Sequence, residues 1–109
     1  MSDVLGSFEQ TVLMALVRLR ADAYGRSVLK EVETRLAREI PAGAVYATLE
    51  RLEGKRLISS RLAPGTPVRG GRARRYYALE GAGVQALNES KAAMDALWQG
   101  LAWPLGGKA

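Results

Sequence analysis

The segment 41–79 constrains the fold most, because three local patterns follow one another within it. An apolar period near 3.6 residues predicts a helix over about 42–54. Strand patterns follow at 57–62 and 72–79, joined by a connection rich in glycine and proline. A helix followed by two strands around a long loop is typical of a recognition helix and a β-wing. The other segments are expected to support this unit.

Three further helices are predicted, over about 7–19, 25–40 and 81–99. The first is expected to have Ser7 as its N-cap, with Gln10 completing a capping box. It is apolar on all sides, which favours a central position. The predicted fold class is mainly α with a two-stranded β-wing, an α+β winged helix-turn-helix with a C-terminal dimerisation helix.

The predicted organisation has three parts. Residues 1–79 form a winged helix-turn-helix DNA-binding domain, 80–103 a dimerisation helix, and 104–109 a flexible tail. The length of 109 residues allows one compact core.

Positive charge is concentrated in one part of the chain. The formal net charge is +5, yet residues 51–77 alone carry eight basic residues and one acidic residue, and the flanking segments are slightly negative. A basic block within a predicted hairpin is typical of a surface that binds polyanions such as nucleic acid. The alternative is a solvated loop that keeps the protein soluble.

The residue types that are absent restrict the chemistry. The sequence has no cysteine and no histidine, which excludes disulfides, thiolate metal sites and the commonest catalytic base. No apolar run approaches the ~18 residues of a membrane span, and the first ten residues are acidic where a signal peptide would be basic. We therefore expect a cytoplasmic protein that is not an enzyme, with no cofactor, metal or membrane partner; DNA binding would make it nucleoid-associated.

The predicted third helix has two distinct faces. Its buried side consists of apolar residues at positions i, i+4 and i+7: Val45, Leu49 and Leu52. Gly43 and Ala47 point away from that side, flanked by Tyr46 and Arg51. Small outward residues allow a helix to approach closely, as entry into a DNA major groove requires. The alternative is that they are ordinary small surface residues.

The last predicted helix carries an apolar seam with alternating three- and four-residue steps, interrupted by Lys91. The seam consists of Val84, Leu87, Met94, Trp98 and Leu101. A spacing near 3.5 residues favours pairing with a second copy of the chain. The alternative is packing on the first helix of the same chain.

Three motifs together resemble the PadR family of winged helix-turn-helix transcriptional regulators in its short form. The first is Tyr24-Gly25 at the start of the second helix. The second is the predicted third helix from Gly43 to Glu53, and the third is the basic strand that ends at Leu79. No single motif is specific for the family, but all three together, in this order and at these separations, are a strong match.

The resemblance implies a homodimeric repressor of an inverted-repeat operator on double-stranded DNA, in many members released by a small aromatic or hydrophobic effector. The residues that it places at DNA are Tyr24, Gly25, Gly43, Tyr46, Ala47, Arg51, Arg72 and Arg74. It gives Trp98 two candidate roles, a platform for an aromatic ligand or packing in the dimer.

Two positions depart from the family pattern. Arg56 stands where members often have glycine, so we expect either a positive φ costing about 1 kcal/mol or a slightly different turn. Glu80 replaces the usual threonine N-cap.

A competing hypothesis is a winged-helix module that binds an acidic protein partner through the basic wing. Whether the chain represses or activates is left open by its sequence.

Overall fold

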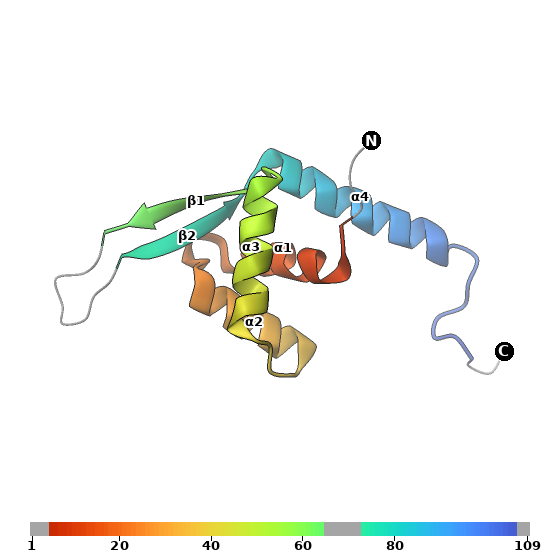
Figure 1. Ribbon diagram of the computed structural model, residues 1–109. Coiled ribbons are helices and arrows are strands. Elements are labelled where there is room, and N and C mark those ends of the chain that lie inside the picture. Colours follow the sequence, from red (N-terminus) through yellow and green to blue (C-terminus); the bar gives the residue numbers. More distant parts are fainter. Residues whose placement is uncertain (1–4, 65–72, 107–109) are drawn as a thin grey trace.

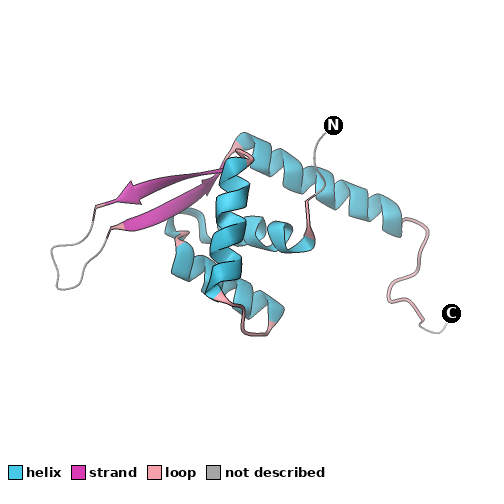
Figure 2. Ribbon diagram, viewed as in Figure 1, coloured by secondary structure: helices cyan, strands magenta, loops and turns pink. Residues whose placement is uncertain are grey.

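The computed structural model of the protein describes residues 5–64 and 73–106, and its mainly helical architecture with one two-stranded sheet confirms the predicted fold class (Figures 1 and 2). The elements in chain order are α1 (Ser7–Leu19), the 3-10 turn η1 (Arg20–Asp22), α2 (Gly25–Leu36), α3 (Ala42–Gly54), β1 (Ile58–Ala63), β2 (Arg74–Leu79) and α4 (Gly81–Trp98). The wing projects from one side of the helical body, and α4 extends toward the other (Figure 1).

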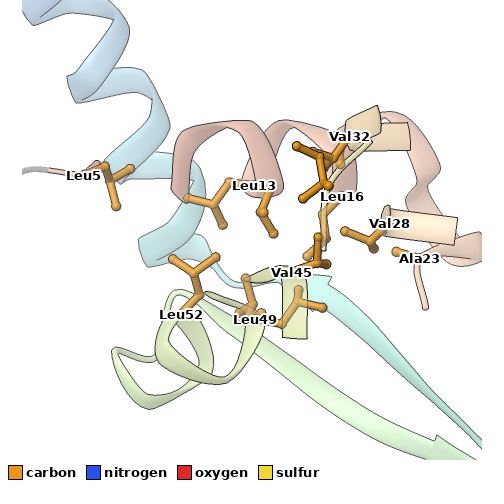
Figure 3. Close-up of a cluster of buried hydrophobic side chains, with 13 residues drawn as sticks. Leu5, Leu13, Leu16, Ala23, Val28, Val32, Val45, Leu49 and Leu52 are labelled. Carbon is orange, nitrogen blue, oxygen red and sulfur yellow. The ribbon is translucent and has the colours of Figure 1, made fainter. Parts of the chain in front are cut away.

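Helix α1 lies at the centre, as its all-round apolar sequence predicted, and contacts α2, α3, β2 and α4. Its side chains meet those of α2 and α3 in one core (Figure 3). The largest fully buried side chains are Leu13, Leu49, Leu52, Ile58, Val12, Val28, Val32 and Val45. The predicted buried side of α3 is thereby confirmed, which fixes which of its faces is left outward.

The start of α1 differs from the prediction by one residue. Gly6, not Ser7, is the N-cap, and its backbone N–H donates to Glu9 Oε1 at 3.0 Å. The Gln10 side chain instead donates to the Leu5 carbonyl. The one-residue shift places Glu9 at the third helical position, where a carboxylate can reach back to the exposed amide.

Helix α2 ends four residues earlier than predicted. Ala37 adopts a left-handed conformation, with φ of 55°, and closes the helix at Leu36. Ile40 is still buried, but from the connecting loop, where its N–H donates to Glu33 Oε2 at 3.0 Å. The apolar period continued to Ile40 although the helix did not.

The turn after α3 contains Arg56, which has a φ of 63° and is one of the expected alternatives. The two strands then pair antiparallel, from Ile58 opposite Leu79 to Ala63 opposite Arg74. The first strand begins and ends one residue later than predicted. The described part of the second begins at Arg74.

The base of the wing is joined to the start of α2. The Tyr77 N–H donates to the Ala23 carbonyl at 2.8 Å, and an isolated bridge pairs Tyr24 with Tyr76. Tyr77 and Leu79 pack against the core, as predicted. Tyr76, predicted to point outward, is half-buried because its ring meets the ring of Tyr24.

Helix α4 begins at Gly81, and Glu80 before it occupies the N-cap position while its carboxylate accepts a hydrogen bond from Ser59 Oγ at 2.8 Å. Gly83 sits so close to the residue before β1 that a methyl group there would overlap the Leu57 carbonyl. None of the helices in the described segments is long and apolar enough for a bilayer crossing.

Candidate nucleic-acid interface

The outward face of α3 is exposed and lightly covered. Gly43 and Ala47 are both exposed, and a methyl group added to Gly43 would meet no atom within 4 Å. Thr48 lies on the buried side, with Val45, Leu49 and Leu52. The geometry predicted for close approach of this face to another surface is therefore present.

Tyr46 lies at the junction of α3 and α2. Its ring packs on Gly25, where any added methyl group would overlap the ring. A side chain at position 25 would therefore force the Tyr46 ring to move from this packing. Half of the Tyr46 side chain, 46%, stays exposed.

An open groove of about 380 Å³ runs between the start of α2, α3 and strand β2. Its lining consists of three arginines and three tyrosines beside one glycine: Arg26, Arg74, Arg75, Tyr24, Tyr46, Tyr77 and Gly25. Burial raises the pKa of Tyr77 above the ordinary 10.0, so its phenol is neutral at physiological pH. The groove is consequently positive, with phenol groups able to donate hydrogen bonds.

Arg74 and Arg61 of the wing each lie over the ring of one of two tyrosines that contact each other. The Arg74 guanidinium carbon lies 4.2 Å from the centroid of the Tyr24 ring, and that of Arg61 lies 5.2 Å from the Tyr76 centroid. The two rings meet edge to face, with centroids 5.6 Å apart. These distances are in the range of cation–π contacts. We call these four residues the arginine–tyrosine stack.

Arg51 has a different partner. Its Nε lies 3.3 Å from Oε2 of Glu9, and Lys55 Nζ lies 3.0 Å from the same oxygen. The Arg51 guanidinium also contacts Thr48 Oγ1 at 3.3 Å. The Glu9 side chain is only 8% exposed. We call Glu9, Arg51 and Lys55 the Glu9 cluster.

Burial alone would raise the pKa of Glu9. The hydrogen bonds from the Gly6 N–H, Lys55 and Arg51 outweigh burial and hold the pKa below the ordinary 4.5. Glu9 is therefore ionised in the folded protein at neutral pH, and it partly neutralises two cations that sequence alone counted as free.

Arg75 is also engaged within the protein. It donates to Ser60 Oγ at 3.0 Å, and that hydroxyl donates to Glu53 Oε2 at 2.6 Å. This relay connects β2, through Ser60 of β1, to the end of α3. Arg75 therefore lines the groove, but one of its donors is already used by Ser60.

The structure thus brings together four of the residues predicted at DNA: Tyr24, Gly25, Tyr46 and Arg74. Gly43 and Ala47 share α3 with Tyr46, whereas Arg51 turns toward α1. Arg72 lies outside the described residues. Sequence analysis missed Arg61 and Tyr76. Alternation within the strand pattern could have placed Arg61 on the wing, but the Tyr24–Tyr76 pairing depends on tertiary structure.

The predicted seam of α4 divides into two halves. In the first half Leu87 packs against the protein's own core, together with Ala86, around the buried Gly83, whereas the predicted seam residue Val84 is 46% exposed. Farther along the same helix Met94 is 51% and Leu97 71% exposed. At 3.6 residues per turn these two continue the line of the packed residues, but the helix has by then run past α1 (Figure 1).

Trp98 closes the helix and packs edge to face on Trp103, with centroids 5.6 Å apart. Trp98 is half-buried by this contact, whereas Trp103 is 79% exposed. Within the described residues, no group of three or more acidic side chains is placed to hold a metal ion.

This arrangement of helices and wing defines a winged helix-turn-helix protein. A family profile described as "Transcriptional regulator PadR-like family" matches residues 12–89. The chain belongs to this family, whose members are DNA-binding transcriptional regulators and not enzymes.

Solved structures of similar fold agree with this assignment. A PadR family transcription regulator from Clostridium difficile R20291 is 27% identical, with a TM-score of 0.68, covering 84% of this chain and 91% of that one. A PadR-like transcription factor from Bacteroides fragilis is 24% identical, with a TM-score of 0.68 and coverage of 83% and 82%.

A third structure, of Bordetella bronchiseptica BpsR, is 20% identical with a TM-score of 0.62, covering 94% of this chain and 72% of that one. It is described as showing how 6-hydroxynicotinic acid regulates the DNA binding of BpsR. No curated protein sequence matches the chain significantly.

Proposed function

We propose that the chain is a homodimeric repressor that binds an inverted-repeat operator through α3 and the wing. The observation that carries the proposal is the open outward face of α3 beside a groove lined by three arginines. Small side chains such as Gly43 and Ala47 allow a helix to approach base edges in the major groove. Arginines beside it supply phosphate contacts, which position the protein on the duplex.

The second half of α4 supports the dimer. Met94 and Leu97 of α4 are more than half exposed, as is Leu101, which lies beyond the end of the helix at Trp98. Met14 and Val17 of α1 are exposed as well. An exposed apolar row of this kind is stabilised when a second copy covers it. In this proposal residues 1–79 bind DNA and residues 80–103 join the subunits. The two copies of α3 are then about one DNA turn, ~34 Å, apart.

The experiment is footprinting on DNA upstream of the gene, with a random duplex of equal length as the control. We expect protection of an inverted repeat, with affinity at least ~10³-fold above random duplex. Binding no tighter than to random duplex would contradict a specific regulator. A reporter downstream of the footprint gives the sign: expression rises on deletion of a repressor and falls on deletion of an activator.

An aromatic effector is a further part of the proposal. Trp98 presents an indole beside Met94 at the end of the dimer helix, and flat aromatic compounds stack well on indole. BpsR, a structural neighbour, has DNA binding regulated by 6-hydroxynicotinic acid. The footprint is repeated with a panel of aromatic compounds on wild type and Trp98→Leu. Release of wild type alone supports a ligand role, whereas equal release of both, or none, leaves Trp98 as a packing residue.

A second candidate function is a protein-interaction module for an acidic partner, favoured by the exposed arginines of the wing. The discriminating variant reverses the charge of Arg72 and Arg74. Loss of DNA retention with the dimer intact supports DNA binding. Unchanged DNA retention with loss of an acidic protein partner supports the interaction module.

A further inference from the structure

In the arginine–tyrosine stack, two basic side chains of the wing are held against aromatic rings of the protein itself. Arg74 lies against the face of Tyr24, Tyr24 meets Tyr76 edge to face, and Arg61 lies against the ring of Tyr76. The four side chains alternate between charge and ring. They connect the start of α2 with both strands of the wing.

The backbone holds the two rings in place. The Tyr24 N–H donates to Ser27 Oγ at 2.9 Å, within the first turn of α2. Tyr24 also forms a bridge with Tyr76, and the next wing residue, Tyr77, donates to the Ala23 carbonyl at 2.8 Å. The rings therefore form a fixed surface to which the two arginines are added.

A guanidinium group that lies on a ring keeps most of its donors available, although the Arg74 guanidinium also interacts with the Tyr76 hydroxyl. The contact uses the flat face of the group, while its N–H bonds lie in the plane and point outward at the edge. A free arginine loses rotamer freedom when it binds a phosphate, which opposes binding. An arginine that is already held on a ring loses less.

We propose that Tyr24 and Tyr76 are positioning residues for DNA binding, whose ring faces hold Arg74 and Arg61 ready for backbone phosphates. The inference rests on the proposed function. It assigns the contribution of Tyr24 to its ring and not to a phosphate contact by its hydroxyl. If the ring is what matters, only removal of the ring weakens DNA binding. If the hydroxyl contacts phosphate, removal of the hydroxyl alone weakens it as well.

The test uses the full-length protein and the footprinted duplex, with affinity measured by fluorescence anisotropy at several salt concentrations. Tyr24→Leu removes the ring face, Tyr24→Phe removes only the hydroxyl, and Arg74→Ala removes the cation. We expect Tyr24→Leu to weaken binding about three- to tenfold and to reduce the salt slope by about one, although it removes no charge. Tyr24→Phe should keep both the affinity and the salt slope at their wild-type values.

The double variant Tyr24→Leu/Arg74→Ala is expected to bind no more weakly than Arg74→Ala, because both changes remove one contact. A change in salt slope from a neutral substitution is the decisive readout, since a loss of stability alone would not produce it. Tyr76→Leu and Tyr76→Phe repeat the comparison for Arg61, where Tyr76→Phe also removes the hydroxyl that interacts with Arg74. They decide the question if Tyr24→Leu does not fold.

The inference is overturned if Tyr24→Phe binds as weakly as Tyr24→Leu, or if the double variant shows the sum of both losses. The Nε–Hε signal of Arg74 gives a readout without DNA. It should show an upfield ring-current shift in wild type and Tyr24→Phe that Tyr24→Leu lacks. Wild type that shows this shift but binds no DNA contradicts the proposed function, and a missing shift contradicts the stack.

Discussion

Two basic clusters of the protein have similar side chains and opposite surroundings. In the Glu9 cluster, Arg51 and Lys55 both contact one carboxylate that is 8% exposed. In the arginine–tyrosine stack, Arg74 and Arg61 lie on neutral rings. A carboxylate neutralises the cations that it holds, whereas a ring orients a cation and leaves its charge in place. Equal positive charge in the sequence thus serves the fold in one cluster and is available to a polyanion in the other.

The largest expected effect is on stability and comes from Glu9, the carboxylate that the arginine–tyrosine stack lacks. Glu9→Gln keeps the shape of the side chain but removes its charge and weakens its hydrogen bonds. We expect the free energy of unfolding to fall by about 2 kcal/mol, less than for a fully buried pair because Arg51 remains hydrated. Urea denaturation measures the change. The exposed Glu39→Gln is the control, and an equal loss in both variants would contradict the special role of Glu9.

The same carboxylate predicts a dependence of stability on pH. The pKa of Glu9 is lower in the folded protein than the ordinary 4.5, so folding favours the ionised form. Its contribution is complete above the unfolded pKa and is lost as pH falls through the lowered folded pKa. The difference between wild type and Glu9→Gln, measured by urea denaturation from pH 7 to pH 3, should therefore shrink with acid. A constant difference would contradict this linkage.

Arginine removal compares the clusters directly. Arg74→Ala should weaken DNA binding by about tenfold and lower the salt slope by about one, with little change in stability. Arg51→Ala should lower the free energy of unfolding by about 0.5–1 kcal/mol and change the salt slope less than Arg74→Ala does. Anisotropy titrations give the affinity and salt slope of each variant, and urea denaturation gives its free energy of unfolding. The opposite pattern would reverse the roles of the clusters.

The smallest expected effect concerns Arg56, a basic residue of the same segment whose backbone has a φ of 63°. Glycine adopts this conformation without steric cost, so Arg56→Gly should raise the free energy of unfolding by about 0.5–1 kcal/mol. Thermal and urea unfolding measure the change. Arg56→Ala, which removes the same charge but keeps the Cβ atom, is the matched control and should not be stabilised.

Local patterns predicted much of this fold. The period of Val45, Leu49 and Leu52 gave the buried side of α3, and the alternation in the second strand placed Tyr77 and Leu79 toward the core. The errors were at helix ends, where one backbone conformation decides. The left-handed Ala37 ended α2 before the apolar period did.

The candidate site was less predictable, because it depends on residues distant in the chain. Arg51 was predicted at DNA from its position on α3, but its ion pair with Glu9 joins residues 42 positions apart. The packing of Tyr46 on Gly25 and of Tyr24 on Tyr76 is likewise tertiary. Charge along the sequence located the basic segment but not the partner of each cation.

The most direct test of the division between the clusters is an NMR titration of the protein with its footprinted duplex, following backbone amides and arginine Nε–Hε signals. The account predicts shifts at Gly43 and Ala47 and at the side chains of Arg74 and Arg61, with the Arg51 side chain unchanged. A shift at Arg51 together with unchanged signals at Arg74 and Gly43 would contradict it.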